Sequence, residues 1–188
     1  MALSKKQIKE FEKLEKEAFY TYDIGPLAGA IAKAGDKGWA RKIYEKAEEK
    51  TNNAYELQIL ASSIFDKIND KKWAKKVYKK AENKAETCND FRDLAGSILE
   101  KLNDKKWVKK VYKKAESNSE DCSDFRSLAD NLCEKLRDKE WAIKVYKKSE
   151  KITENFNDFS DLATSLCENL GDKKWAKLVY KKAEEKAE

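Results

Sequence analysis

The stretch DKKWAKKVYKKAE, residues 70–82, decides the fold because the chain repeats it. A looser copy precedes it and three close copies follow it: DKGWARKIYEKAE (36–48), DKKWVKKVYKKAE (104–116), DKEWAIKVYKKSE (138–150) and DKKWAKLVYKKAE (172–184). The Trp and the Tyr of this phrase each return every 34 residues. Self-similarity at a fixed period is typical of solenoids, so the sequence predicts a stack of five similar units.

The phrase itself predicts a helix, which we call helix B of each repeat. Its Asp is a favoured N-cap residue. In residues 104–116 the apolar side chains fall on one stripe of an α-helix, and the opposite face is rich in lysine. The stripe consists of Trp107, Val108, Val111, Tyr112 and Ala115. We expect the recurring Trp to pack between successive repeats.

A second helix, which we call helix A, is predicted before each helix B. Residues 89–103 (NDFRDLAGSILEKLN) carry apolar side chains at helical spacing, with Asn89 as the expected N-cap. Copies are expected to open at Ser123 and Asn157, and earlier copies cover 55–69 and a segment starting at Gly25-Pro26. The connection from helix A to helix B is about two residues long, which makes the two helices antiparallel neighbours.

These patterns predict an all-α fold. It is an α-solenoid of five 34-residue helix-turn-helix repeats that forms a single domain over residues 23–188. Residues 1–22 do not fit the repeat, although residues 4–7 (SKKQ) have the form of a capping box. A helical stripe follows at Ile8, Phe11, Leu14, Ala18 and Phe19. We expect this N-terminal capping helix to cover the open apolar end of the first repeat.

Composition narrows the class of protein. Hydrophobic residues make up 40% of the chain, too many for a disordered tail, and six Gly and one Pro are too few for a β-rich fold. Neither a transmembrane run nor a signal-peptide pattern stands out, so a cytoplasmic protein is expected. With no His and no C-x-x-C spacing, the sequence predicts no zinc site, cofactor, small-molecule substrate or enzymatic activity.

The four cysteines occupy two repeat-equivalent positions. Cys88 and Cys122 are 34 residues apart, and so are Cys133 and Cys167. Equivalent positions of stacked helices lie about 10 Å apart, beyond the reach of a disulfide. We therefore expect four reduced thiols that are buried as small apolar side chains.

The chain resembles the tetratricopeptide repeat family, which also places two helices in each 34-residue repeat. The first repeat matches the family spacing at Leu27, Ala28, Ile31, Ala40, Tyr44 and Ala47. Repeats two to five keep the helix B positions but have one more residue in helix A before the turn. The resemblance implies a protein-interaction scaffold whose A helices line a concave face and hold an extended peptide or a partner helix.

Two surfaces are candidates for binding a partner. On the A helices, polar positions that vary between copies are the candidate peptide-binding residues: Arg92, Gly96, Arg126, Asp130, Ser160 and Thr164. On the B helices, lysines spaced four apart are the candidate anion-binding residues: Lys71, Lys75, Lys79, Lys105, Lys109 and Lys113.

Three hypotheses about function remain open. The leading one is a scaffold that binds a protein or a peptide, although variation on the A helices is also what unconstrained surface positions would give. The second is electrostatic binding of nucleic acid or an anionic membrane by the lysines, against which stands a merely solvated face. This second hypothesis lacks exposed rings for base stacking, since Trp and Tyr share the core stripe. The third is a structural or designed array with no ligand.

Overall fold

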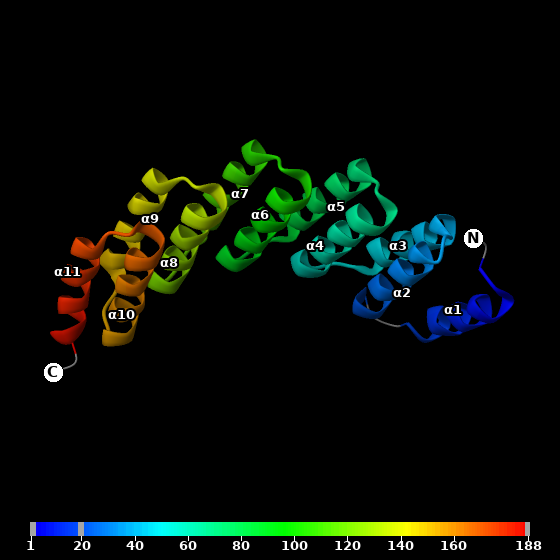
Figure 1. The fold of residues 1–188 in the computed structure, drawn as a ribbon, viewed down its shortest axis with the longest axis horizontal. Helices are drawn as coiled ribbons and strands as arrows, with labels where there is room; N and C mark the ends of the chain where they lie inside the picture. The colour runs from blue at the N-terminus through cyan, green and yellow to red at the C-terminus, as the bar shows by residue number, and fades with distance from the viewer. Residues whose placement is uncertain (1–2, 19–20, 187–188) are drawn as a thin grey trace. The chain divides into compact units, whose positions relative to one another are not determined.

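The computed structural model describes residues 3–18 and 21–186, which are helical apart from short connections and contain no strand (Figure 1). The predicted all-α repeat fold is therefore confirmed. The α-helices of this described part are α1 (Lys5–Glu17), α2 (Thr21–Lys33), α3 (Lys37–Lys50), α4 (Ala54–Ser63), α5 (Lys71–Lys84), α6 (Cys88–Leu102), α7 (Lys105–Ser117), α8 (Cys122–Asn131), α9 (Lys139–Ile152), α10 (Phe156–Ser165) and α11 (Lys173–Glu184). Three π-helical turns follow α4, α8 and α10: η1 (Ile64–Ile68), η2 (Leu132–Leu136) and η3 (Leu166–Leu170).

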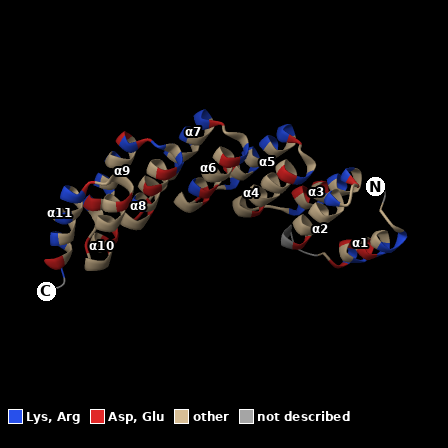
Figure 2. Ribbon diagram, viewed as in Figure 1, with Lys and Arg blue, Asp and Glu red and all other residues tan. Residues whose placement is uncertain are grey.

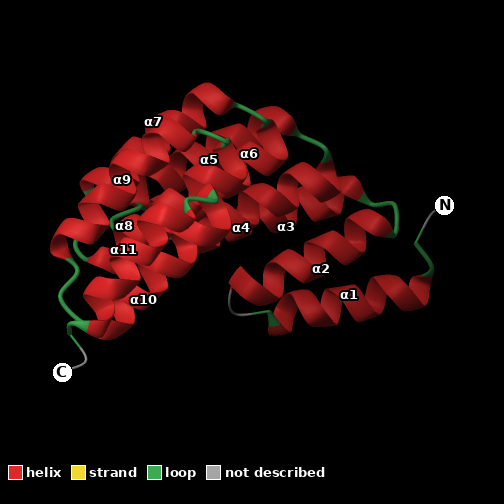
Figure 3. Cartoon of the chain, turned by 60° about the vertical axis from the view of Figure 1, so that its left-hand side comes forward, coloured by secondary structure: helices red, strands yellow, loops and turns green. Residues whose placement is uncertain are grey.

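Each predicted repeat forms a helical hairpin, and short loops join the helices (Figure 3). The even-numbered helices α2 to α10 are the A helices, and the odd-numbered helices α3 to α11 are the B helices. The chain divides into two compact units, Met1–Ala85 with Glu100–Asn103 and Glu86–Leu99 with Asp104–Glu188. The assignment of residues 23–188 to a single domain stays a prediction.

The core of each unit consists of the predicted apolar stripes. The recurring Tyr is fully buried in the first four repeats: Tyr44, Tyr78, Tyr112 and Tyr146. Small Ala or Val side chains next to it, such as Ala74 and Val108, are buried as well. The fifth copy, Tyr180 on α11, is 44% exposed. Its ring lies on the side of α11 that no described helix covers.

The B helices begin where the sequence predicts. In all five, the carboxylate of the recurring Asp accepts a hydrogen bond from the backbone N–H of the Trp three residues later, at 2.8–3.3 Å. This bond satisfies one of the N–H groups that a helix start leaves without a partner. The N-cap residues are Asp36, Asp70, Asp104, Asp138 and Asp172.

The A helices begin two residues earlier than predicted. Asn89, Ser123 and Asn157 lie inside the first turns of α6, α8 and α10 rather than at their N-caps. The caps are instead Asp121, Asn155 and, before α6, the Thr87 hydroxyl, which accepts from the N–H of Asp90 at 3.1 Å. The Asp90 carboxylate accepts in turn from the Thr87 N–H at 3.0 Å. This reciprocal pair is a capping box, which fixes the helix start more firmly than a single polar residue.

The start of α2 also differs from the prediction. The helix begins at Thr21, so Gly25 and Pro26 lie within it rather than at its start. A proline here lacks the N–H that would bond the carbonyl four residues back. The carbonyl of Gly25 accepts a hydrogen bond from outside the helix, from the hydroxyl of Tyr44 at 3.3 Å.

π-helical turns accommodate the extra residue in repeats two, four and five, whereas α6 of repeat three continues as an α-helix to Leu102 and is followed by Asn103 at φ 51°. η1, η2 and η3 each end at a residue in the left-handed conformation, namely Asn69, Arg137 and Gly171. The amide of Asp138 then donates to the carbonyl of Leu132 at 2.9 Å, and the amide of Asp172 donates to Leu166 at 3.2 Å. A wider turn therefore absorbs one residue and still delivers the chain to the N-cap Asp of helix B.

A recurring polar contact joins successive B helices within each unit. The indole N–H of Trp73 donates to one carboxylate oxygen of Glu48 at 2.6 Å, and Lys80 pairs with the other oxygen. The same set recurs as Glu116–Trp141–Lys148 and as Glu150–Trp175–Lys182. We call it the Glu–Trp–Lys contact. It confirms the predicted packing between successive hairpins for Trp73, Trp141 and Trp175, all of which are half-buried.

Residues 1–22 fit the repeat better than predicted. The segment FEKLE (11–15) of α1 parallels YEKAE (44–48) of α3. Glu15 accepts from the Trp39 indole N–H at 2.8 Å and pairs with Lys46, so α1 supplies the Glu of a further Glu–Trp–Lys contact. The capping box at Ser4 is confirmed. Phe19, the last residue of the predicted stripe, lies outside the described residues.

The four cysteines are free, as predicted. Cys88 and Cys133 are buried, and burial raises the pKa of both thiols. Cys122 is half-buried, and Cys167 is exposed. The prediction of burial is thus wrong for Cys167, which follows the buried Leu166 in η3 and faces away from the core.

Arg137 offers a test of the turn. Its φ of 57° costs an L-residue about 1 kcal/mol, whereas the equivalent Gly171 adopts φ 73° without a Cβ clash. Arg137→Gly is therefore expected to raise the free energy of unfolding by about 0.5–1 kcal/mol in urea denaturation. The reverse change, Gly171→Arg, should lower it by a similar amount. Loss of stability in Arg137→Gly would contradict this account of the turn.

Glu48 offers a test of the Glu–Trp–Lys contact. Burial opposes its ionisation, but hydrogen bonds from Lys80 and Trp73 dominate and lower its pKa below the ordinary 4.5. A lowered pKa stabilises the fold fully above pH 4.5, and this stabilisation disappears as the pH falls through the folded-state value. Glu48→Gln is expected to lower the free energy of unfolding by about 1–2 kcal/mol at pH 7.

The difference between wild type and Glu48→Gln should shrink steadily below pH 4.5 in urea titrations at several pH values. The exposed Glu49, next to it on α3, gives the control Glu49→Gln. A difference that is the same at pH 7 and at pH 3 would show that the Glu48 charge contributes nothing.

Candidate ligand-binding surfaces

The predicted A-helix positions fall into two sets. The inner position lies eight residues before the recurring Asp, at Ser62, Gly96, Asp130 and Thr164. The outer position lies twelve residues before it, at Arg92, Arg126 and Ser160. Both were predicted to face a ligand, and the structure gives them different neighbours.

The inner position serves the buried Tyr of the same hairpin. The Ser62 and Tyr78 hydroxyls are 2.8 Å apart, and the Tyr146 hydroxyl donates to the Asp130 carboxylate at 2.6 Å. Asp130 also accepts from Asn169 Nδ2 at 2.7 Å and from Ser165 Oγ at 3.3 Å. Burial and the neighbouring Asp130 carboxylate together raise the pKa of Tyr146 well above its ordinary value. Asp130 is thus committed to holding two hairpins of the second unit together.

The third repeat lacks this partner. Its inner position is Gly96, and the Tyr112 hydroxyl is buried without a hydrogen-bond partner in the described residues. Burial raises the pKa of Tyr112 to about 12. A Cβ at Gly96 would lie 3.2 Å from Lys135 Nζ, the mobile end of a long side chain. The residue at the inner position therefore varies between repeats together with the hydrogen bonding of the buried Tyr hydroxyl, not with a binding face.

The remaining predicted A-helix residues lie at the surface. Arg126 is half-buried and pairs with Asp161 of the next A helix at 3.1 Å. Arg92 and Ser160 are half-buried, and exposed Thr164 donates its hydroxyl to the Ser160 carbonyl at 3.0 Å. The structure therefore brings Arg126 and Asp130 into inter-hairpin contacts. It leaves Arg92, Ser160 and Thr164 as separate polar side chains.

A hollow in the first unit was not predicted. It has a volume of about 600 Å³ and lies between the A helices α2 and α4. It is lined by Gly25, Pro26, Gly29 and Ala30 of α2 and by Tyr55, Ile59 and Ser63 of α4. Tyr55 is 62% exposed and Ile59 is 42% exposed. Lys33, Glu56 and Lys67 supply its charges.

Two sequence features produce this hollow. Tyr55 and Ile59 occupy positions where the later A helices carry Asn or Ser and Asp or Ser. On α2, Gly25 and Gly29 stand where α6 has Arg92 and Gly96, so little side-chain volume rises from the helix. Large apolar side chains on one helix next to a bare neighbour make an apolar depression. Comparison of the repeats position by position would have found it.

The predicted anion-binding lysines are exposed on α5 and α7. Lys109 pairs with Asp138 at 2.9 Å, and this bond lowers the pKa of Asp138. Other lysines of the B helices, such as Lys80 and Lys148, belong to Glu–Trp–Lys contacts. Figure 2 shows Lys and Arg along α11 and Asp and Glu on α8. Part of the positive charge is thus used for stacking hairpins.

Within the described residues 3–18 and 21–186, no group of three or more Cys, Asp or Glu side chains lies close enough to hold a metal ion. No helix in this part of the chain has the length and apolarity needed to cross a membrane. A scan against models of known protein families and a search of curated proteins both found no match.

The inner position predicts opposite effects for two equivalent tyrosines. Tyr146→Phe breaks the bond to Asp130 and is expected to lower the free energy of unfolding by about 1–2 kcal/mol. Tyr112→Phe removes a hydroxyl that has no partner in the described chain, so its effect should lie between zero and about 1 kcal/mol of stabilisation. Urea denaturation of both variants measures the difference. Equal losses would show that the inner position does not matter.

Proposed function

We propose that this chain is a non-catalytic scaffold, similar to tetratricopeptide repeat proteins, and that it binds a protein or peptide on its A helices. The binding site is the hollow between α2 and α4. The observation that carries the proposal is the exposure of Tyr55 and Ile59 beside an apolar depression of about 600 Å³. Exposed apolar side chains gathered around a concavity are typical of recognition sites.

The hollow suits one class of ligand. Its volume accepts a bulky apolar side chain, packed against the Tyr55 and Ile59 side chains and the small residues of α2. Tyr is favoured in such sites because its rigid ring buries a large area at low entropic cost. Lys33 and Lys67, which also line the hollow, would attract a carboxylate. The ligand is therefore a peptide segment with a large apolar residue next to acidic ones.

Binding of nucleic acid or an anionic membrane by the B-helix lysines is the less favoured function. On α5 and α7, which carry the candidate lysines, the recurring rings Tyr78 and Tyr112 are fully buried and cannot stack on bases. Lys109 already has a carboxylate partner. Such binding would weaken steeply with added salt, whereas seating an apolar side chain in the hollow depends on salt far less.

A selected peptide tests the proposal. A random peptide library is selected on the wild-type chain, and the bound peptides are titrated by fluorescence anisotropy. They are expected to combine a large apolar residue with Asp or Glu. Tyr55→Ser/Ile59→Ser should weaken binding at least about tenfold, because two apolar contacts of about 1 kcal/mol or more each are lost. Lys33→Gln should weaken it less, by about twofold to fivefold.

The matched control is Asn89→Ser/Asp93→Ser, which changes the equivalent positions of the third repeat. It should leave the affinity unchanged. Peptides whose binding is unaffected by Tyr55→Ser/Ile59→Ser would contradict the proposed site. Binding that disappears at high salt and tracks Lys105 and Lys113 instead would favour the lysine face.

A further inference from the structure

Helix α1 reproduces the stacking surface of a B helix. Phe11 packs edge-on against Trp39, with ring centroids 6.0 Å apart, as Tyr44 packs on Trp73 at 6.4 Å. Glu15 lies four residues after Phe11, just as Glu48 follows Tyr44, and it bonds both Trp39 and Lys46. The side of the first hairpin that carries Trp39 and Lys46 is therefore occupied as if a preceding repeat were present.

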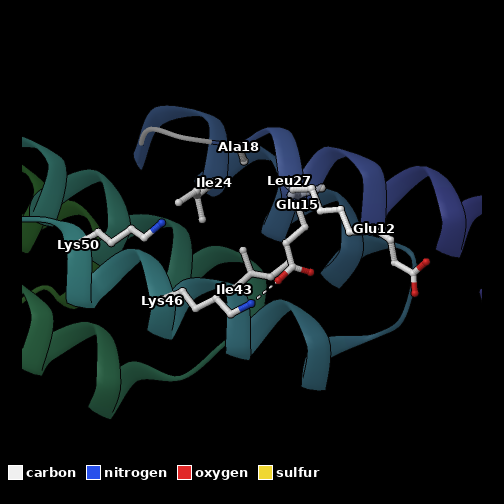
Figure 4. Close-up of a pocket in the computed structure, with 9 residues that line it drawn as sticks. Glu12, Glu15, Ala18, Ile24, Leu27, Ile43, Lys46 and Lys50 are labelled. Atoms are coloured by element: carbon white, nitrogen blue, oxygen red, sulfur yellow. Dashed lines mark hydrogen bonds and ion pairs between the residues drawn. The ribbon is translucent and has the colours of Figure 1, made fainter.

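Helix α1 packs loosely on the first hairpin. No residue of α1 is buried. Hollows of about 520 and 500 Å³ lie where α1 meets the first hairpin, lined by apolar residues such as Ile24, Leu27 and Ile43. Figure 4 shows Glu15 directed at Lys46 while Glu12 points away from it. A helix that buries so little apolar surface is held mainly by a few contacts, so a competitor can displace it.

Among the described residues, helix α11 presents the same surface and no helix packs on it. Its Tyr180 and Glu184 occupy the positions of Tyr44 and Glu48. Tyr180 is 44% exposed, and Glu184 is exposed with no hydrogen-bond or ion-pair partner among the described residues. Leu178 is 64% exposed at a position where the four earlier copies have Lys. Leu178 thus replaces a charged side chain on a B helix whose stacking surface is uncovered among the described residues.

We propose that α11 of one copy docks on the α2–α3 hairpin of a second copy, in the place that α1 occupies. Glu184 then bonds Trp39 and Lys46 of the second copy, and Tyr180 packs against the Trp39 ring. The Glu–Trp–Lys contact of the repeats thus becomes an intermolecular contact. Helix α1 acts as an internal competitor that keeps the chain from assembling head to tail.

Charge and chemistry favour a second copy as the occupant. The accepting hairpin offers Trp39, Lys46 and Lys50, and α11 offers Glu184 beside exposed apolar side chains. The same pairing already stacks α9 on α7 and α11 on α9 within the second unit. An attached helix competes at an effective concentration on the order of millimolar, so the wild-type chain at micromolar concentration stays unassembled.

The test releases α1 in the full chain. Phe11→Ala/Glu15→Gln removes the ring contact and the charge, and α1 amides are then expected to exchange hydrogen at least about tenfold faster than in wild type. Sedimentation velocity should show a mean mass that rises with protein concentration, since each copy bound through its α11 still offers its own open hairpin to another copy. The control Glu12→Gln, a change to an exposed α1 residue outside the contact, should leave the chain monomeric.

A second pair of changes identifies the docking partner. Adding Leu178→Lys/Glu184→Lys to the released chain should return it to a monomer, because α11 now repels Lys46. Mixed with wild type, this blocked chain should form a complex of one copy each, since wild type still offers its α11. Oligomers that persist in the blocked chain would overturn the proposal. So would released chains that stay monomeric, or α1 amides that remain protected after the two substitutions.

Discussion

The Glu–Trp–Lys contact is the constraint on which the repeat fold depends. A Trp placed between two hairpins buries most of its ring but must also satisfy its indole N–H, and a carboxylate does so best. Glu48, Glu116 and Glu150 each accept that bond and pair with a Lys seven residues after the Trp. Because all three residues lie on B helices, their spacing fixes the 34-residue period. The B helices are thereby held to one sequence, and the A helices are free to vary.

The freedom of the A helices is limited by the buried Tyr. Its hydroxyl reaches the inner position of its own hairpin, where Ser62 and Asp130 bond it and Gly96 does not. A change of residue at this position therefore changes the stability of its repeat. Variation at positions farther from the Tyr has no such cost. Tyr55 and Ile59 are of that kind, and large apolar residues there face a helix surface made of Gly, Pro and Ala. That difference in packing constraint separates structural variation from variation available for recognition.

The sequence predicted a helix start correctly where only one residue nearby could cap that helix. The recurring Asp has only helix B to cap, so all five starts are right. Helix A starts are wrong because two polar residues compete, and the reciprocal bond of Thr87 with Asp90 decides between them. The hollow was missed because it depends on two neighbouring helices at once. The polarity of Asp130 and Arg126 predicts a ligand contact, but both side chains instead form contacts between hairpins, with Asn169 and Asp161.

Two differences between α1 and a true B helix correspond to contacts that an A helix supplies in a hairpin and that α1 does not have among the described residues. In the first hairpin, the Tyr44 hydroxyl donates to helix A at the Gly25 carbonyl, and Ala47, three residues after this Tyr, is fully buried. No described A helix packs on α1 in this way. A hydroxyl at position 11 would then have no partner, and Phe11 omits it. Nothing limits the size of the residue equivalent to Ala47, and this is Leu14, which is 43% exposed. The residues that meet Trp39, by contrast, are kept. Helix α1 thus keeps the B-helix residues that stack on the next hairpin, Phe11 and Glu15, and differs at the positions that pack within a hairpin. This pattern is expected of a helix that occupies the stacking surface of the first hairpin.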